Sequence, residues 1–147
     1  MNIAYFLRPK STVAFLYDDN SFRRGLEKMR QHGYTAIPVI NRDGRYISTV
    51  SEGDFLWHIL DSAGEKQTSM RDLEQLQVRD ILREGSYPAV PITVTMDKLL
   101  DNAMRQNFIP VVDDAGSFIG IITRQDIIRY FAALKEKEKI AELRCSV

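Results

Sequence analysis

The chain is short of cysteine and histidine, and it carries no excess of charge of either sign. Its 147 residues include one cysteine, Cys145, and two histidines, so a disulfide within the chain is excluded. Twenty basic residues balance twenty acidic ones. Such a chain has no overall field to attract nucleic acid or an anionic membrane, so a bound anion needs a local site.

The sequence also lacks long apolar runs and a secretion signal. No stretch approaches the roughly 20 apolar residues that a helix needs to cross a bilayer. The first ten residues have no basic segment followed by an apolar one. We therefore expect a cytoplasmic protein without nucleic-acid or membrane partners.

Catalytic groups are scarce as well. His32 and His58 stand apart from any cysteine or carboxylate pattern typical of a metal site. The chain has neither a Walker-type glycine loop nor a GxGxxG motif. An enzyme needs a nucleophile with a base, a paired acid and base, or metal ligands at suitable spacing. We expect a protein that is not an enzyme and that needs no metal to fold.

What the chain does have is an internal repeat. Ile3 is matched by Val78, 75 positions on, and Asp54 by Asp126, 72 positions on, because one turn is three residues shorter in the second copy. Glycine, proline and aspartate recur in step with the apolar residues, which is harder to obtain by chance than apolar matches alone. The matched stretches are "NIAYFLR" (2–8) with "QVRDILR" (77–83), and "IPVINRDGRYISTVSEGD" (37–54) with "IPVVDDAGSFIGIITRQD" (109–126).

Each copy predicts the same five elements: a strand, a helix, two strands joined by a glycine-containing turn, and a second helix. With 44% hydrophobic residues the chain can build a shared core, and the fold class that we expect is α/β (α+β). In the first copy, strands are expected at 13–17, 36–40 and 46–50, one helix after a cap among 18–21, and one from about Ser51. In the second copy, a strand is expected at 89–94, a helix after Thr95 or Asp97, and the last helix from about Thr123.

The chain divides accordingly into four segments. The first copy spans 1–60 and the second 78–134. The polar residues 61–77 form a surface connector, in which a short helical turn is expected. The charged residues 135–147 are expected to extend the last helix into solvent.

Both copies end in a hydroxyl residue followed three positions later by aspartate, and this pattern has two interpretations. Ser51 with Asp54, and Thr123 with Asp126, fit a capping box, in which each side chain bonds the other residue's backbone N–H. The same turn at the start of a helix suits a phosphate at the backbone N–H groups. The aspartate can accept hydrogen bonds from both hydroxyls of a ribose. The pattern alone leaves both interpretations open.

Together these residues carry a family resemblance. "YTAIPVINRDGRYISTVSEGD" (34–54) and "NFIPVVDDAGSFIGIITRQD" (107–126), each preceded by "NIAYFL" or "VRDIL", resemble the tandem cystathionine-β-synthase (CBS) motif pair, also called a Bateman module. The resemblance covers about residues 2–134. It implies two motifs that pack through their sheets with pseudo-twofold symmetry and leave two clefts for AMP, ADP, ATP, S-adenosylmethionine or cyclic di-AMP. It also implies a regulatory role exerted on a separate, unknown protein.

The resemblance further implies a set of site residues. Asp54 and Asp126 would hold ribose hydroxyls, while Ser51 and Thr123 would contact phosphate. The basic Arg124 beside them can pair with phosphate as a fork. The adenine would lie against Tyr34, Thr35, Ala36, Ile37 and Pro38 in the first copy and Asn107, Phe108, Ile109 and Pro110 in the second, with 14–16 and 89–91 on its other side.

The two copies differ at this site. The second copy has Gly120 and Arg124 but the shorter turn, whereas the first has Ser48 in place of the glycine and Glu52 where an anion would prefer a cation. These differences favour a ligand that bridges both copies, or one occupied site, over two equal sites. Further phosphate candidates, for each of which the ordinary exposed cation is the favoured interpretation, are Arg8, Lys10, Arg42 and Arg45.

An alternative function needs no ligand. The helices predicted at 54–60 and 126–134 are apolar on more than one face. Each must then bury a second face, and we expect a homodimer. Without a nucleotide, the chain would be a ligand-independent dimeric scaffold or a protein-interaction adaptor.

Overall fold

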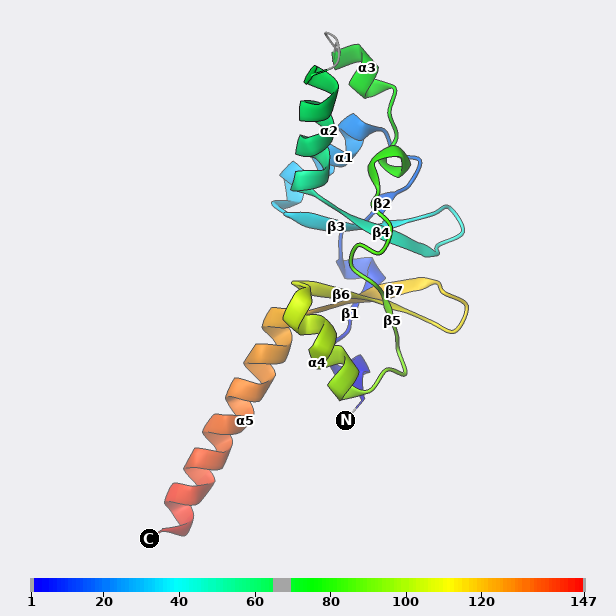
Figure 1. Cartoon of the computed structure of the whole chain (residues 1–147). Helices are drawn as coiled ribbons and strands as arrows, with labels where there is room; N and C mark the ends of the chain where they lie inside the picture. The colour runs from blue at the N-terminus through cyan, green and yellow to red at the C-terminus, as the bar shows by residue number, and fades with distance from the viewer. Residues whose placement is uncertain (1, 65–69, 147) are drawn as a thin grey trace.

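The computed structural model describes residues 2–64 and 70–146. Together they fold into two halves, one above the other in Figure 1. Each half has a small β-sheet with helices on its outer side. The two sheets face each other in the middle of the molecule (Figure 1). The expected α/β class and the tandem repeat are confirmed.

The first half follows the predicted order of elements: β2 (Leu16–Tyr17), α1 (Phe22–His32), β3 (Ala36–Ile40), β4 (Tyr46–Ser51) and α2 (Glu52–Gly64). Ser21 caps α1, because its side chain accepts a hydrogen bond from the Arg24 N–H. Gly33 ends this helix with a φ of 68°, a left-handed conformation that suits glycine. In the sheet, β3 pairs parallel with β2 and antiparallel with β4.

The second half repeats this order with β5 (Val90–Pro91), α4 (Met96–Arg105), β6 (Phe108–Val112), β7 (Phe118–Thr123) and α5 (Arg124–Cys145). Thr95 is the cap of α4. The first strand of each half is shorter than the predicted stretches 13–17 and 89–94. The reason is that only two residues of β2 pair with β3, and only two of β5 pair with β6.

The segments that lead into the two copies are exchanged between the halves. The 3-10 helix η1 (Ile3–Phe6) precedes the first copy in the sequence, but its first and last residues are buried in the core of the second half. The strand β1 (Arg8–Pro9) pairs with β7, so the sheet of the second half has the order β1-β7-β6-β5. A further 3-10 helix, η2 (Lys10–Thr12), then leads to β2. In return, η3 (Val78–Ile81) buries its first and last residues in the first half.

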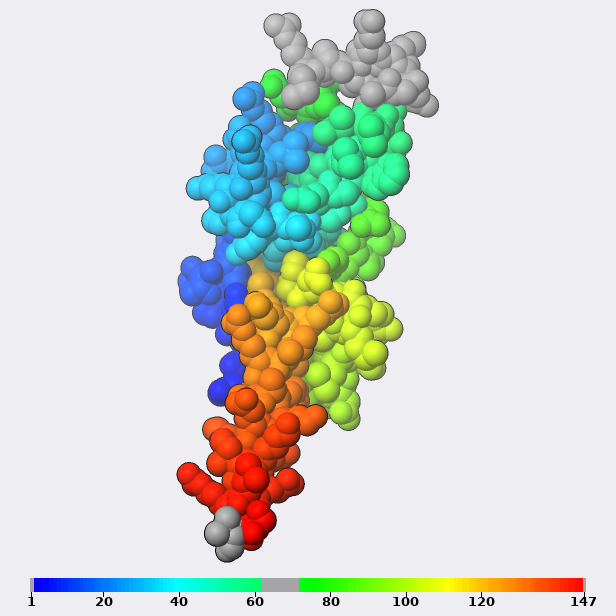
Figure 2. Space-filling model, turned by 90° about the vertical axis from the view of Figure 1, so that its left-hand side faces the viewer, coloured from blue at the N-terminus to red at the C-terminus, as the bar shows by residue number. Residues whose placement is uncertain are grey.

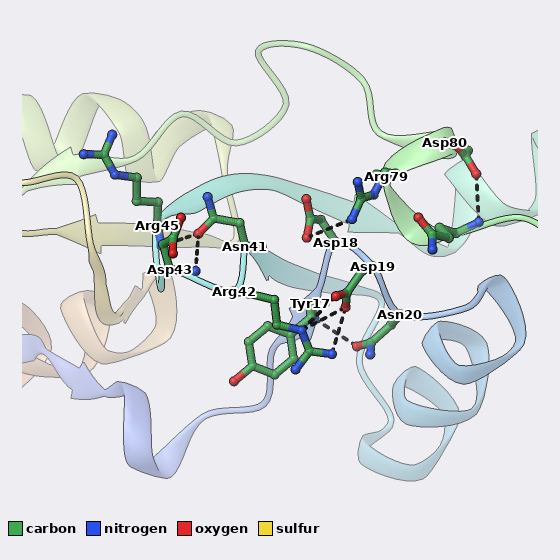
Figure 3. Close-up of polar contacts among 11 residues, drawn as sticks. Tyr17, Asp18, Asp19, Asn20, Asn41, Arg42, Asp43, Arg45, Arg79 and Asp80 are labelled. Carbon is green, nitrogen blue, oxygen red and sulfur yellow. Dashed lines mark hydrogen bonds and ion pairs between the residues drawn. The ribbon is translucent and has the colours of Figure 1, made fainter.

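Polar contacts hold η3 against the first half (Figure 3). The Val78 N–H donates to the Asn20 carbonyl at 2.8 Å, and the Arg79 N–H donates to the Asp18 carbonyl at 2.9 Å. The Arg79 and Asp18 side chains also form an ion pair, with Nη2 3.7 Å from Oδ1. The backbone of η3 is therefore tied to the loop between β2 and α1.

The two sheets meet in an apolar cluster that includes Ile40 of β3 and Phe118 of β7. Two backbone hydrogen bonds join the hairpins of the two halves. The Tyr46 N–H donates to the Gly116 carbonyl at 3.3 Å, and the Phe118 N–H donates to the Gly44 carbonyl at 2.8 Å. The halves therefore share a core rather than touching only at their surfaces.

The end of α2 and the short helix that follows it lie at the opposite end of the molecule from the end of α5 (Figure 1). The short helix α3 (Met70–Glu74) lies within the predicted connector, of which residues 65–69 are outside the described residues. The charged segment from 135 continues α5 to Cys145 and projects beyond both halves (Figure 2). Within residues 2–64 and 70–146, no helix has the length and apolarity that crossing a membrane requires.

Candidate functional site

The repeated hydroxyl–aspartate turn lies at the start of α2 and of α5. At α2 it forms a complete capping box: the Asp54 N–H donates to Ser51 Oγ at 3.2 Å, and the Ser51 N–H donates to Asp54 Oδ2 at 2.9 Å. At α5, the Asp126 N–H donates to Thr123 Oγ1 at 3.2 Å. The capping interpretation is thus confirmed for Ser51 and Asp54.

Each aspartate also holds an arginine from the exchanged lead-in. Arg8 makes two hydrogen bonds to Asp126, from Nε to Oδ2 at 2.7 Å and from Nη2 to Oδ1 at 2.9 Å. Arg83 places its Nε 2.6 Å from Asp54 Oδ1. The Asp126 side chain is 25% exposed and that of Asp54 is 4% exposed. Each carboxylate therefore binds an arginine from a distant part of the chain and is not bonded only to the local backbone.

A surface pocket opens at each of these ion pairs. The first has a volume of about 500 Å³ and the second about 470 Å³, within the range of small-ligand sites. The two linings correspond through the repeat. Residues Asp54, Trp57, His58, Ile81 and Arg83 border the first pocket, and their equivalents Asp126, Arg129, Tyr130, Phe6 and Arg8 border the second.

The second pocket combines one carboxylate with two cations. The hydrogen bonds from Arg8 lower the pKa of Asp126 below its ordinary value, and the charge of Arg129 acts in the same direction. Asp126 in turn raises the pKa of Arg8, and Tyr34 adds a smaller electrostatic contribution. Both members of the pair are therefore charged at neutral pH.

The predicted adenine segments adjoin the turns. The Thr35 carbonyl accepts the Glu52 N–H at 2.9 Å, and the Asn107 carbonyl accepts the Arg124 N–H at 2.9 Å, so the same bond occurs in both halves. The described residues that line the two pockets include neither segment. Four residues of these segments have buried side chains and would contact a ligand only through their backbone. They are Ile37, Pro38, Ile109 and Pro110.

The remaining members of these segments are less buried. Tyr34 is exposed and stacks on His32, with ring centres 5.6 Å apart. Phe108 lies against Tyr87, with ring centres 5.0 Å apart, and Ala36 is half-buried. Their contacts with a base stay predictions.

Two arginines make contacts that the sequence did not indicate. Arg124 donates from Nε to the Ala103 carbonyl at 2.6 Å, which directs that part of the guanidinium toward α4, and its contact with phosphate stays a prediction. Arg83 was not among the predicted site residues. Its signal in the sequence is the match with Arg8, since both arginines close their lead-in segments.

The outer faces of α2 and α5 carry exposed apolar side chains. Those on α2 are Leu56, Trp57 and Leu60. Those on the part of α5 within the second copy are Ile128, Phe131 and Leu134, and Ile140 and Leu143 follow in the charged extension. Leu56 and Ile128 occupy equivalent positions in the repeat. These faces correspond to the helices from which a homodimer is predicted.

Comparison with known proteins gives one family and several relatives. The family model described as the CBS domain matches residues 7–61 and 78–133. An uncharacterized protein of Methanocaldococcus jannaschii, MJ1426, is 27% identical over 77% of this chain and 82% of its own length. The uncharacterized protein MK0525 of Methanopyrus kandleri is 28% identical over 76% of this chain. The match spans 55% of the length of that relative.

Two solved structures share the fold. CbpB in complex with c-di-AMP superposes with a TM-score of 0.85 at 21% identity, covering 96% of this chain and 91% of that one. CBSX2 in complex with AMP superposes with a TM-score of 0.70 at 23% identity, covering 92% and 98%. The pairing of two such motifs is therefore shared with proteins of distant sequence.

Proposed function

This chain belongs to the CBS domain family, and we propose that it is a regulatory module that binds an adenine nucleotide and acts on a separate protein. The candidate ligands are AMP, ADP, ATP, S-adenosylmethionine and cyclic di-AMP. The observation that carries the proposal is the pocket at the start of α5, which is lined by Asp126, by its ion-pair partner Arg8 and by Arg129.

The chemistry of this pocket suits a ribose phosphate. An ionised carboxylate such as that of Asp126 has two oxygens that accept hydrogen bonds, and a ribose has two adjacent hydroxyls that donate them. The guanidinium groups of Arg8 and Arg129 favour a phosphate. In the first turn of α5, the Arg124 and Asp126 N–H groups already donate to the Asn107 carbonyl and to Thr123 Oγ1, so the two guanidinium groups are the main partners proposed for phosphate.

Relatives by fold support the class of ligand. CbpB was solved with c-di-AMP and CBSX2 with AMP, and both compounds contain adenine, ribose and phosphate. In this proposal, binding draws the two halves together or reorders the connector at 61–77, and so changes the surface that a partner protein meets.

A ligand panel tests the proposal. Each candidate is added at millimolar concentration, and the melting temperature is measured. A ligand at a hundredfold excess over its Kd stabilises the folded chain by about 2.7 kcal/mol, so at least one candidate should raise the melting temperature by several degrees.

The variant Asp126→Ala should weaken binding and leave the chain folded, because this side chain is partly exposed. Asp54→Ala is the poorer test of binding, since Asp54 is buried and forms the capping box. Asp19→Ala is the matched control: Asp19 also pairs with an arginine, Arg42, but lies outside both pockets (Figure 3).

A second candidate function rests on the exposed apolar faces of α2 and α5. If no compound in the panel raises the melting temperature, the chain is better described as a ligand-independent dimeric scaffold or a protein-interaction adaptor. Its first assay is then the oligomeric state rather than a ligand.

A further inference from the structure

The two carboxylates predicted to hold ribose are occupied in different ways. Both oxygens of Asp126 accept hydrogen bonds from Arg8, Oδ2 from Nε at 2.7 Å and Oδ1 from Nη2 at 2.9 Å. In Asp54, Oδ1 lies 2.6 Å from Arg83 Nε, while Oδ2 accepts the Ser51 N–H at 2.9 Å. Movement of one arginine side chain therefore frees both oxygens of Asp126, but only one oxygen of Asp54.

A ribose and a guanidinium compete for the same two oxygens. Each presents two adjacent donors that match a carboxylate, so a ribose can take both oxygens of Asp126 only when Arg8 leaves them. Arg8 can do so without unfolding the lead-in. Its side chain is 45% exposed, and its backbone remains in β1, opposite Ile121 of β7.

A guanidinium that loses its carboxylate is stable only if it regains water or another anion. A nucleotide brings such an anion in its phosphate, whereas a nucleoside brings none. Displacing Arg8 from Asp126 is therefore less costly for a ribose that carries a phosphate than for the ribose of a neutral nucleoside.

We propose that Arg8 makes the Asp126 pocket selective for anionic nucleotides over neutral nucleosides. The ribose hydroxyls replace Arg8 on Asp126, and the Arg8 guanidinium moves to the phosphate of the same ligand. Adenosine breaks the same ion pair but leaves Arg8 without an anion, so it binds weakly. This inference rests on the proposed nucleotide-binding function and adds the residue that distinguishes anionic from neutral ligands.

The test compares adenosine with AMP on the full chain by isothermal titration calorimetry. Wild type should bind AMP more tightly than adenosine by about tenfold or more. In Arg8→Met, which keeps most of the side-chain bulk, this ratio should fall by about tenfold, because AMP loses a charged partner and adenosine no longer displaces one. Arg8→Gln gives the same comparison if Arg8→Met does not fold.

Arg42→Met is the matched control. Arg42 also makes a two-bonded ion pair, with Asp19, at 2.8 Å from Nε to Oδ2 and 2.8 Å from Nη2 to Oδ1 (Figure 3). The sequence made Arg42 a candidate for phosphate, but in the structure it pairs with Asp19 and borders neither pocket. The ratio of the AMP and adenosine affinities should therefore be the same in Arg42→Met as in wild type.

The outcomes separate this inference from the function on which it rests. An unchanged ratio in Arg8→Met, or an equal fall in Arg42→Met, overturns the role of Arg8 and leaves nucleotide binding intact. Binding of cyclic di-AMP without AMP does the same, because the esterified 3′-oxygens of cyclic di-AMP cannot complete the two-hydroxyl contact. Failure of every compound in the panel, with wild type and Arg8→Met alike, overturns the proposed function itself.

Discussion

Arg8 and Asp126 are 118 positions apart in the chain, yet their side chains form a two-bonded ion pair, with Nε 2.7 Å from Oδ2 and Nη2 2.9 Å from Oδ1. The pair joins β1 to the first turn of α5. Arg83 and Asp54 make the corresponding connection in the other direction. The two copies are therefore not independent modules, because each half contains the lead-in of the other.

The Arg8–Asp126 pair should stabilise the fold at neutral pH and lose this effect in acid. Hydrogen bonds from Arg8 lower the pKa of Asp126 in the folded chain, whereas an aspartate in the unfolded chain has a pKa of about 3.9. A carboxyl group whose pKa is lowered by folding stabilises the fold above its unfolded pKa. The effect is lost as the pH falls through the folded pKa.

A double-mutant cycle of Arg8→Met and Asp126→Asn, followed by urea unfolding, measures this contribution. Both side chains are partly exposed, so the coupling free energy should be about 0.2–1 kcal/mol at pH 7. It should decrease below about pH 4. A coupling energy that grows on acidification would contradict the assignment.

Several features of the fold could be predicted because they depend on local chemistry. β3 has the predicted bounds, 36–40, and β4 continues past the predicted 46–50 only to Ser51. Ser21 and Thr95, both among the predicted candidates, are the helix caps. Caps and hairpins are set by residues close together in the chain, so the sequence pattern was sufficient for them.

The exchange of the lead-ins could not be predicted in this way. Ile3 and Val78 have the same apolar character, and the two cores that receive them are built from matching elements. The pattern therefore fits packing on either half equally well. The contact between Arg83 and Asp54 depends on this exchange, and for that reason Arg83 was missed.

Gly120 should not tolerate a side chain, because β1 passes directly over it. In the register of β1 and β7, Gly120 lies opposite Pro9. A Cβ at Gly120 would clash with the Arg8 carbonyl oxygen and would lie 3.0 Å from Leu7 Cδ1. We expect Gly120→Ala to lower the free energy of unfolding by about 1–3 kcal/mol in urea denaturation.

The equivalent residue, Ser48, supplies the control for this prediction. Its Oγ lies 3.2 Å from the Arg83 carbonyl oxygen and 3.5 Å from that of Ser86, and its single hydroxyl proton is shared between these acceptors, so the side chain fills the space rather than clashing. Ser48→Ala should lose only this hydroxyl hydrogen bond, about 0.5–1.5 kcal/mol. If Gly120→Ala cost nothing, the close passage of β1 over β7 would be wrong.

Leu56 on α2 and Ile128 on α5 should lie in a homodimer interface. They occupy equivalent positions and are 54% and 59% exposed, within the apolar outer faces of the two helices. Replacing both by aspartate should convert a dimer into monomers in size-exclusion chromatography with light scattering, because an unpaired carboxylate is costly to bury. Met104→Asp is the control, since Met104 is an apolar residue of α4 that is 81% exposed outside these faces. A monomeric wild type, or a dimer that survives both aspartates, would exclude this interface.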